Sequence, residues 1–350
     1  MPVETTRPRV LYVPGAPAAT GASAPPVVAT IGSFDGVHLG HRALLNVVAR
    51  RAAERGVCTA VITFDPHPRR VLRPEAPLRL ISSLDERLVL FAEAGLDYVL
   101  VWRFDAALRA LSPSEFLDAL GRYVTLRHLV HGPGFALGKG RAGTPDVLAA
   151  LGRVRGFTVE EVGLQRLNGP TGTTPVTSTG VRDSIEDGRV REAAQALGRE
   201  PTLAGIVVEG EKIGRTLGFP TANLSLDPQL VVPADGVYAA RAELSPFTPH
   251  AITHSAAVSI GERPTFDGRR RVVEAYLLDF DGDLYGQTLR LHFVERLRGQ
   301  ERFDSIGALI EQMTRDVAQA RALLLSSPKP ARQEHPLQSP ERAAGAAAQR

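Results

Sequence analysis

Short apolar runs alternate with helical patterns over residues 27–198. The periodicity predicts helices over about Leu39–Glu54, after Ser83 and after Ser112. Between them, runs rich in β-branched residues predict buried strands, namely VVATI, VCTAVITF, DYVLVW and RHLVHG. Strands that alternate with helices in this way are typical of a parallel sheet wrapped by helices. We therefore predict an α/β domain over this part of the chain.

The expected helix starts carry local signals of their own. Two Ser-x-x-Glu strings, Ser83–Glu86 and Ser112–Glu115, match the capping box, in which side chains satisfy free N–H groups at a helix start. Two further short helices are expected, one after Thr179 and one over about Val190–Leu197. The second of these brings the α/β domain to its end near residue 198.

A different pattern follows over residues 199–325. Segments punctuated by Gly and Pro predict antiparallel strands of a small barrel or sandwich, namely LAGIVVEG, GVYAARAEL, HSAAVSI, RVVEAYLLDF and TLRLHFVERL. Apolar residues then recur on one helical face over Ser305–Leu325, which predicts a closing helix. Residues 1–26 and 326–350 lack such periodicity and are rich in Pro and Ala, so we expect both ends to be flexible.

Composition narrows the class of protein. The 350 residues are 43% hydrophobic and 23% charged, and no apolar run approaches the roughly 18 residues of a membrane span. The net charge of +3, from 41 basic and 38 acidic residues, is too balanced for a non-specific nucleic-acid binder. Cys58 is the only cysteine, which excludes internal disulfides and cysteine-based zinc sites. We expect a cytoplasmic protein with small-molecule substrates and neither membrane nor nucleic-acid partners; the sequence leaves its oligomeric state open.

The first chemical motif follows the strand VVATI and opens the first helix. Its glycines allow the backbone to approach a ligand at the carboxyl edge of the sheet, where open α/β folds bind phosphates. His38 and His41 are three residues apart at the helix start, so both imidazoles can project on one side and donate hydrogen bonds to phosphate oxygens. The candidate nucleotide-binding residues here are Gly32, Phe34, Asp35, Gly36, His38 and His41.

This Gly-x-Phe-Asp-Gly-x-His-x-Gly-His string resembles the signature of the HxGH nucleotidyltransferases. The resemblance implies an enzyme that transfers a nucleotidyl group from a triphosphate and releases pyrophosphate, without a covalent enzyme intermediate. It also implies that His38 and His41 hold the triphosphate and stabilise the pentavalent transition state. Such chemistry depends mainly on positioning and charge stabilisation, which suits these residue types.

Two shorter strings extend the resemblance. Thr177–Arg182 looks like the Ser-Thr-x-x-Arg segment of that family, in which Arg182 would contact the β- and γ-phosphates while Ser178 and Thr179 offer hydroxyl and N–H groups. Taken alone, the segment would be an ordinary helix N-cap. The string Phe-Asp-Pro-His-Pro, which ends the second strand, resembles enzymes that adenylylate FMN. It is either a proline-fixed turn or a place where His67 lines the flavin or ATP pocket.

A second chemical motif lies in the β domain. Its glycines permit a flap over phosphates, Lys212 and Arg215 can neutralise them, and Thr221 and Asn223 present oxygens on one side of an extended strand. Such oxygens suit Mg²⁺, partly bound through ATP. A surface hairpin loop is the alternative. The candidate phosphate-binding residues are Gly210, Lys212, Gly214, Arg215, Gly218, Pro220, Thr221 and Asn223.

The string Gly-Phe-Pro-Thr-Ala-Asn resembles the signature of the riboflavin kinases. That resemblance implies a small antiparallel barrel, with Mg²⁺-ATP placed against Thr221 and Asn223. It also implies a glutamate general base on a later strand, and Glu274 matches this position within the apolar run RVVEAYLLDF. Ser259 stands where the family usually has Asn, a change that we expect to be tolerated.

Together the motifs, over about residues 27–325, resemble the bifunctional riboflavin kinase/FMN adenylyltransferase family, also called FAD synthetases. The resemblance implies a nucleotidyltransferase-like α/β domain that makes FAD and pyrophosphate from FMN and ATP. The barrel domain would make FMN and ADP from riboflavin and ATP. One alternative is a riboflavin kinase with a degenerate N-terminal module. Another is a non-catalytic protein that binds flavin or nucleotide, which the intact Glu274, His38 and His41 argue against.

One segment departs from the family. Related enzymes usually have Gly-x-Asp/Asn-Phe-x-Phe-Gly where this chain has Gly132–Gly138, with Gly134 in place of the polar residue and Leu137 in place of the second Phe. A polar side chain that helps to hold nucleotide and flavin is therefore missing, although Lys139 remains to meet a phosphate. We expect FMN adenylylation to be weaker than riboflavin phosphorylation.

Overall fold

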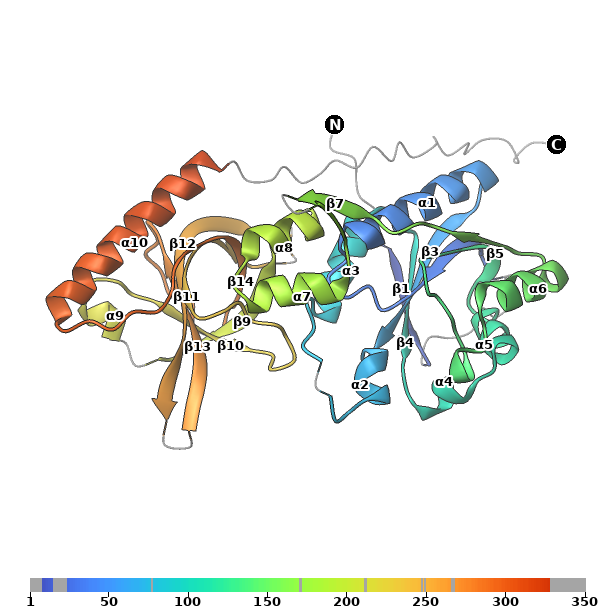
Figure 1. Ribbon diagram of the computed structural model, residues 1–350, viewed down its shortest axis with the longest axis horizontal. Coiled ribbons are helices and arrows are strands. Elements are labelled where there is room, and N and C mark those ends of the chain that lie inside the picture. The colour runs from blue at the N-terminus through green and yellow to red at the C-terminus, as the bar shows by residue number, and fades with distance from the viewer. Residues whose placement is uncertain are drawn as a thin grey trace, which may run out of the picture.

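The computed structural model describes residues 8–14, 24–76, 78–169, 172–210, 213–246, 248, 250–265 and 268–327. Figure 1 shows a sheet covered by helices on one side of the molecule and a barrel on the other, with two short helices between them. This confirms the predicted architecture of a parallel-sheet domain followed by a small antiparallel barrel and a C-terminal helix. No helix in the described part of the chain is long and apolar enough to cross a membrane.

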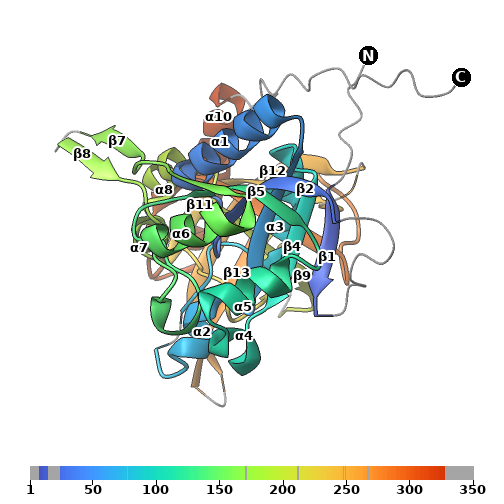
Figure 2. The ribbon, with the colours of Figure 1, turned by 90° about the vertical axis from the view of Figure 1, so that its right-hand side faces the viewer.

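The N-terminal sheet is parallel throughout, with the strand order β1-β4-β3-β2-β5-β6. Apolar side chains of α1 and α3 pack on one face of the sheet, and those of α4, α5 and α6 pack on the other. Figure 2 shows α4, α5 and α6 on the side that faces the viewer. Because all strands run the same way, the loops that follow them meet at one carboxyl edge. The elements are β1 (Arg9–Val13), β2 (Pro26–Ile31), α1 (Leu39–Arg55), β3 (Cys58–Asp65), α2 (Pro68–Leu72), α3 (Leu84–Glu93), β4 (Tyr98–Arg103), α4 (Ala106–Ala110), α5 (Pro113–Leu120), β5 (Thr125–His131), the 3₁₀ turn η1 (Lys139–Arg141), α6 (Pro145–Arg155) and β6 (Thr158–Glu161).

The C-terminal sheet closes into a barrel with the order β10-β13-β12-β11-β14-β9, which decides between the barrel and the sandwich. Its strands are antiparallel, and side chains alternate between the barrel core and the outer face. Helix α10 packs on the outside against β11 and β12. The elements are β9 (Thr202–Val208), α9 (Ile213–Thr216), β10 (Ala222–Leu226), β11 (Gly236–Leu244), β12 (Ile252–Thr265), β13 (Gly268–Leu277), β14 (Thr288–Arg298) and α10 (Ile306–Ser326).

The two parts are packed together rather than merely tethered. The chain between them forms the hairpin β7 (Arg166–Gly169) and β8 (Gly172–Pro175), then α7 (Ser178–Glu186) and α8 (Val190–Leu197). Leu78 and Leu80, which precede α3, are buried in the same apolar cluster as the barrel interior. Leu80 also forms a parallel β-bridge with Leu230 of the barrel domain. The sheet and the barrel therefore share apolar contacts as well as backbone hydrogen bonds.

Three local expectations need correction. Within the N-terminal segment that we expected to be flexible, Arg9–Val13 forms β1 and pairs with β4, because RVLYV offers apolar and β-branched residues to the edge of the sheet. The edge strand β6 was not predicted. The predicted capping box at Ser83 is only half formed. The Ser83 hydroxyl oxygen accepts from the Glu86 N–H, but the Glu86 carboxylate accepts from the Thr202 hydroxyl instead of from the Ser83 N–H. Most of the other terminal residues that we expected to be flexible lie outside the described part of the chain, namely 1–7, 15–23 and 328–350.

Candidate active sites

The loop between β2 and α1 carries the first motif in a strained conformation. Phe34, Gly36 and Val37 all have positive φ angles, of 53°, 79° and 39°. Gly36 has no room for a side chain, because a Cβ atom there would lie 2.8 Å from Cγ2 of Ile81. Its N–H donates to the Ser82 hydroxyl at 2.9 Å. Non-glycine residues keep such backbone angles only when their surroundings hold them, and they are frequent at functional sites.

His38 and His41 lie together at the start of α1. Their rings stack with centroids 3.7 Å apart, and Nδ1 of His38 accepts a hydrogen bond from the His41 backbone N–H at 3.3 Å. Burial, followed by the nearby charge of Arg199, lowers the pKa of His38 to about 4. Burial and then His38 hold the pKa of His41 well below its usual range. Both imidazoles are therefore neutral at pH 7, and the hydrogen bond assigns the proton of His38 to Nε2.

Two predicted nucleotide-binding residues point into the protein instead. The Phe34 ring is buried against His41 and Phe91, with centroids 5.0 and 5.5 Å away, so a nucleotide could meet only its backbone. Asp35 is 3% exposed, and its carboxylate accepts hydrogen bonds from the N–H groups of Ile81 at 2.8 Å and Ser82 at 3.2 Å. Burial raises the pKa of Asp35, and Arg182, followed by these two N–H groups, opposes that shift.

The second short string lies directly against the first. Nη2 of Arg182 on α7 donates to Oδ2 of Asp35 at 2.8 Å, and the Ser178 hydroxyl donates to the Asp35 carbonyl at 3.0 Å. The structure thus joins the two motifs. Thr179 is exposed, and the helix is capped by Thr177, whose hydroxyl oxygen accepts from the Gly180 N–H at 3.1 Å. The cap therefore lies one residue before the pair Ser178 and Thr179 that the sequence singled out.

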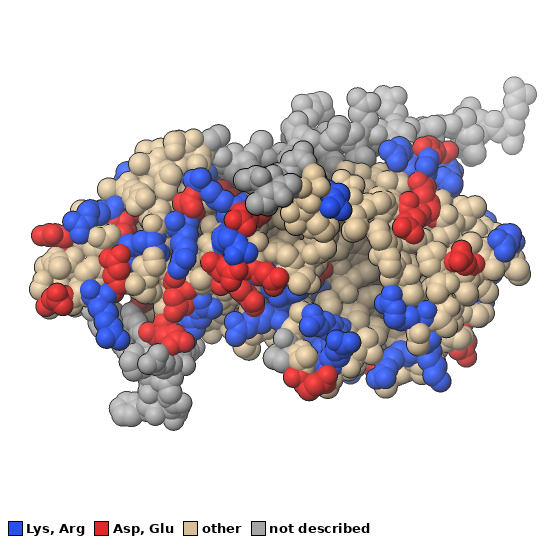
Figure 3. All heavy atoms as spheres, in the orientation of Figure 1, with Lys and Arg blue, Asp and Glu red and all other residues tan. Residues whose placement is uncertain are grey.

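His67 follows the proline-fixed turn and lies in electropositive surroundings. It caps the short helix α2, since its Nδ1 accepts from the Arg69 N–H at 3.1 Å. Burial lowers its pKa to about 4, and the arginines that lower it further are, in order, Arg87, Arg182, Arg69 and Arg70. Figure 3 shows basic side chains gathered over the region of α2, beside a hollow between the two domains. The surroundings of His67 are therefore electropositive, as a phosphate site requires.

Arg87 lies beneath the motif loop and was not singled out from the sequence. It is 2% exposed on α3, and its Nη1 donates to the Ser33 carbonyl at 2.9 Å, the Thr63 hydroxyl at 3.0 Å and the Phe64 carbonyl at 3.3 Å. Burial lowers its pKa. Arg87 thus ties the ends of β2 and β3 together beneath the motif loop. Its position inside a predicted helix carried no signal of this role.

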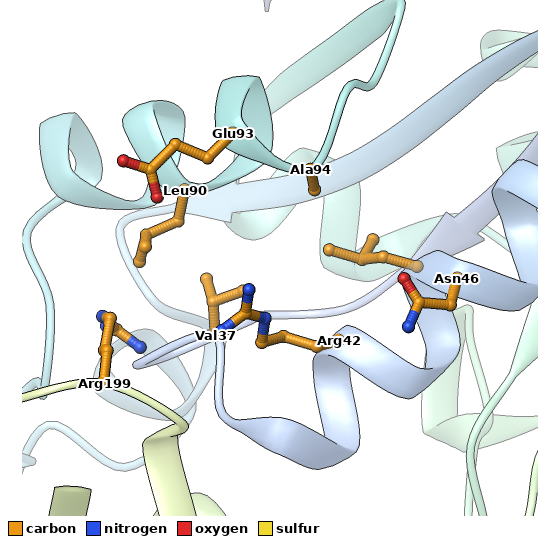
Figure 4. Close-up of a pocket in the computed structure, with 8 residues that line it drawn as sticks. Val37, Arg42, Asn46, Leu90, Glu93, Ala94 and Arg199 are labelled. Atoms are coloured by element: carbon orange, nitrogen blue, oxygen red, sulfur yellow. The ribbon is translucent and has the colours of Figure 1, made fainter. Parts of the chain in front are cut away.

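The described part of the sheet domain has two pockets, of which the smaller includes Val37 of the motif loop. The larger has a volume of about 420 Å³ and opens at the carboxyl ends of β1, β3 and β4, within the size range of small-molecule sites. Figure 4 shows the smaller pocket, in which Arg42 of α1 and Arg199 lie below Leu90 and Glu93 of α3. Nη1 of Arg199 is buried there without a hydrogen-bond partner in the described part of the chain. The larger pocket is lined by Tyr12, Val13, Pro14, Asp65, Pro66, Val101 and Arg103.

The departing segment follows β5, with Pro133 and Gly134 exposed and Leu137 buried in the core of the sheet domain. Gly134 has φ +66°, and a Cβ atom on it would meet nothing within 4 Å. Its carbonyl accepts from Nη2 of Arg141 at 2.7 Å. Lys139 is exposed on η1, and its backbone N–H donates to Leu111 at 2.7 Å. The loop lies at the carboxyl edge of the sheet, but these hydrogen bonds of Gly134 and Lys139 do not reach the histidines.

The barrel places Glu274 among polar residues from neighbouring strands. Glu274 on β13 is paired with Asn223 on β10 and with Ser259 on β12. Its neighbours Val273 and Ala275 are buried in the barrel core, so the Glu274 side chain belongs to the outer face. Residues paired directly across antiparallel strands share a face. A carboxylate, an amide and a hydroxyl therefore lie side by side on the outside of the barrel.

The glycine-rich segment packs closely against this face. A Cβ atom on Gly210 would lie 2.3 Å from Nδ2 of Asn223, and one on Gly214 would lie 3.3 Å from the Thr221 hydroxyl and 2.4 Å from the Phe219 carbonyl. Only glycine therefore allows the chain to come so near to the two predicted metal-binding side chains. Lys212 and the side chain of Arg215 lie outside what the structure describes.

Aromatic and backbone contacts hold the rest of that segment. The Phe219 ring packs edge-on against Tyr276 of β13, with centroids 5.4 Å apart, and its N–H donates to the Gly214 carbonyl at 2.8 Å. Gly218, with φ +87°, makes the turn before Pro220. Tyr276 is two residues from Glu274 and shares its face of β13. The contact therefore brings the Gly-Phe-Pro-Thr string beside the predicted base.

Ser259, which departs from the family, has a partner of its own. Nε2 of Gln300 donates to the Ser259 hydroxyl at 3.2 Å and to the Ile260 carbonyl at 2.7 Å. Gln300 follows β14 and was not singled out by the sequence. The short Ser259 side chain is thus held by Gln300, from the segment that follows β14.

Fold and sites together define a class: an α/β nucleotidyltransferase-like domain with paired histidines, followed by a barrel with a Thr-x-Asn segment and an opposed glutamate. A family model for riboflavin kinase matches residues 197–324, and one for FAD synthetase matches residues 21–174. The chain belongs to the bifunctional riboflavin kinase/FMN adenylyltransferase family.

Curated relatives match this chain over most of its length. The bifunctional riboflavin kinase/FMN adenylyltransferase of Pseudomonas fluorescens is 40% identical, over 86% of this chain and 94% of its own length. The enzyme of the same name from Escherichia coli (strain K12) is 37% identical, over 84% of this chain and 91% of its own. A crystal structure described as a macrolide-efflux protein from Streptococcus pneumoniae superposes with a TM-score of 0.74 at 28% identity, covering 89% of this chain and 98% of that one.

Proposed function

We propose that the barrel domain converts riboflavin and ATP to FMN and ADP, and that the N-terminal domain converts FMN and ATP to FAD and pyrophosphate. The observation that carries the assignment is the pairing of Glu274 with Asn223 in one domain and of Asp35 with Arg182 in the other. Each pairing joins two motifs that are distant in the sequence. The domain limits, 27–198 and 199–325, and the cytoplasmic location are part of the same proposal.

In the kinase site, Glu274 accepts the proton of the riboflavin 5′-hydroxyl, whose oxygen then attacks the γ-phosphorus of ATP. ADP leaves as the bond to the β-γ bridging oxygen breaks. Thr221 and Asn223 lie on the nucleotide side of this reaction, because the glycine segment packs directly over them. A base positioned in this way typically contributes about 10² to 10⁴ in rate.

Magnesium fits the same site. The Thr221 hydroxyl and the Asn223 amide oxygen are hard ligands of the kind that Mg²⁺ prefers. The described part of the chain has no group of three His, Cys, Asp or Glu side chains that could hold a metal ion. Most ligands would therefore be phosphate oxygens and water, with the ion neutralising charge on the phosphates.

In the adenylyltransferase site, a phosphate oxygen of FMN attacks the α-phosphorus of ATP and pyrophosphate leaves. Nε2–H of the neutral His38 and the ring of His41 face the triphosphate at the start of α1, and Arg182 stabilises the leaving pyrophosphate. The flavin ring occupies the pocket at the carboxyl ends of β1, β3 and β4, whose lining includes Asp65 and Pro66 directly before His67. Gly32, Gly36 and Ser178 supply backbone and hydroxyl groups that shape the loop.

Purified enzyme with riboflavin and Mg²⁺-ATP tests this assignment, with FMN and FAD separated by chromatography. Glu274→Gln should lower FMN formation by about 10² to 10⁴ and leave FAD formation from supplied FMN intact. His41→Ala should lower FAD formation by about 10² to 10³ and spare the kinase, so each variant is the control for the other. Riboflavin kinase activity without any FAD would support the kinase-only alternative. The absence of both products would support a binding protein.

A further inference from the structure

A short segment before α3 touches the strained motif loop at several points. The Ser82 hydroxyl oxygen accepts from the Gly36 N–H at 2.9 Å, and the Ser82 backbone N–H donates to Oδ1 of Asp35 at 3.2 Å. The Ile81 N–H donates to the same oxygen at 2.8 Å. Ser82 is 1% exposed. It therefore holds the loop from behind and does not reach a substrate.

The same segment also holds the arginine of the second motif. Nε of Arg182 donates to the Arg79 carbonyl at 2.6 Å, while its Nη2 donates to Asp35 at 2.8 Å. A guanidinium fixed at two nitrogens has one orientation. Residues 79–82 thus set the position of Arg182 directly and also through Asp35.

The far side of the segment is anchored to the barrel. The Leu80 N–H donates to the Gln229 carbonyl at 2.7 Å, and the Leu80 carbonyl accepts from the Val231 N–H at 2.8 Å. The Leu80 side chain is buried with the barrel core. The segment is therefore held in place on one side while its other side contacts the motif loop.

We propose that Ser82 is a positioning residue for FMN adenylylation, acting through Gly36 and Asp35 on the nucleotide loop and on Arg182. This inference rests on the proposed function of the N-terminal domain. Phe34 and Val37 keep positive φ angles in that loop, and such angles persist only under external restraint. Ser82 supplies that restraint with a hydroxyl that is the partner of the buried Gly36 N–H.

Removal of the hydroxyl leaves that N–H without its partner and lets the loop shift. Ser82→Ala should lower kcat for FAD formation by about 10- to 100-fold. A small displacement of preorganised donors acts mainly on the transition state, so KM for ATP should change by less than about threefold. Riboflavin phosphorylation should stay at the wild-type rate.

Two further substitutions separate hydrogen bonding from packing. Ser82→Cys keeps the size of the side chain but offers only a weak acceptor, so it should be as slow as Ser82→Ala. Ser82→Thr keeps the hydroxyl and should recover most of the lost turnover. Ser83→Ala is the matched control, because the Ser83 hydroxyl oxygen accepts from Glu86 at the start of α3 and is not bonded to the motif loop. It should leave kcat for FAD formation unchanged.

If kcat for FAD formation by Ser82→Ala stayed within twofold of wild type, the role of Ser82 would be overturned, and the proposed function of the N-terminal domain would stand. Equal losses in Ser82→Ala and Ser83→Ala, or a parallel loss of kinase activity, would show a general structural role and overturn it as well. A wild-type enzyme that makes FMN but no FAD would overturn the proposed function of the domain together with this inference.

Discussion

Arg182 illustrates how one residue combines structure with chemistry. Two of its nitrogens are engaged with Asp35 and Arg79, so a phosphate would meet the N–H groups that remain on Nη1 and Nη2. The pair with Asp35 is nearly neutral as a whole, which makes its burial tolerable. The positive charge around His67 is shared among Arg87, Arg182 and the arginines of α2.

Gly134 offers a residue-scale test of the departure from the family. Its φ of +66° is a conformation that Asn and Asp adopt more readily than other side-chain-bearing residues, and a Cβ atom there meets open space. Gly134→Asn or Gly134→Asp should therefore fold normally and restore the missing polar group. If the new side chain makes one hydrogen bond worth about 0.5 to 1.5 kcal/mol in the transition state, FAD formation should become about two- to tenfold faster. A steady-state assay measures this rate.

Gly140→Asn is the matched control, because Gly140 has φ +62° in the same loop and equally open surroundings. It should leave FAD formation unchanged. Wild-type adenylylation at least as fast as the kinase step, with no gain in either Gly134 variant, would show that the departure is already compensated.

At the scale of elements, α10 is held to the barrel by both apolar and ionic contacts. Ala320 and Leu324 pack on the outer face of the barrel together with Ala239 and Ala257. Asp316 of the same helix is 4% exposed, and its carboxylate accepts from Nε and Nη2 of Arg298 on β14, with a shortest distance of 2.7 Å. Tyr276 of β13, which shares an outer face with Glu274, packs in the same cluster, so the helix borders the proposed kinase site.

Asp316→Ala should lower the free energy of unfolding by about 3 to 5 kcal/mol, since it leaves the Arg298 guanidinium without its partner in a largely buried place. Urea denaturation measures the change. Arg321→Ala on the same helix is the control, because its ion pair with Asp279 is exposed and should contribute little. Equal effects of the two substitutions would contradict a special role for the buried pair.

At the scale of the whole molecule, the two domains share a core. Leu78, Leu80 and Val190 lie in one apolar cluster with the barrel interior, and Ile81 packs with Val231 in another. Shared burial of this kind couples the stabilities of the two parts. The enzyme is therefore expected to unfold as one unit, although its two proposed active sites lie in separate domains.

Leu80→Ala tests this coupling. The large-to-small change should lower the free energy of unfolding by about 2 to 5 kcal/mol and lower the inactivation temperatures of both activities together. Scanning calorimetry and residual activity after heating measure the two effects. Val154→Ala, at a residue 87% exposed on α6, should change neither. Two separate unfolding transitions, or loss of one activity alone, would show that the domains are independent.

Local patterns predicted most of the elements and both motifs. The helix over about Leu39–Glu54 is observed as Leu39–Arg55, and the helix over about Val190–Leu197 has those bounds. Caps, turns and helical periodicity act over a few residues, so a sequence window contains what determines them. For the same reason, His38 with His41 and Thr221 with Asn223 could be recognised as chemical pairs.

The tertiary structure alone decided which distant residues meet. Arg182 contacts Asp35 across 147 positions, and Ser82 contacts Gly36 across 46. Such contacts depend on the path of the chain around the sheet, which no local pattern records. The strand β1 was missed because an edge strand of five residues forms only against a neighbour that is already in place. The sequence by itself therefore determined the chemistry of each site, and the fold decided how its groups are held.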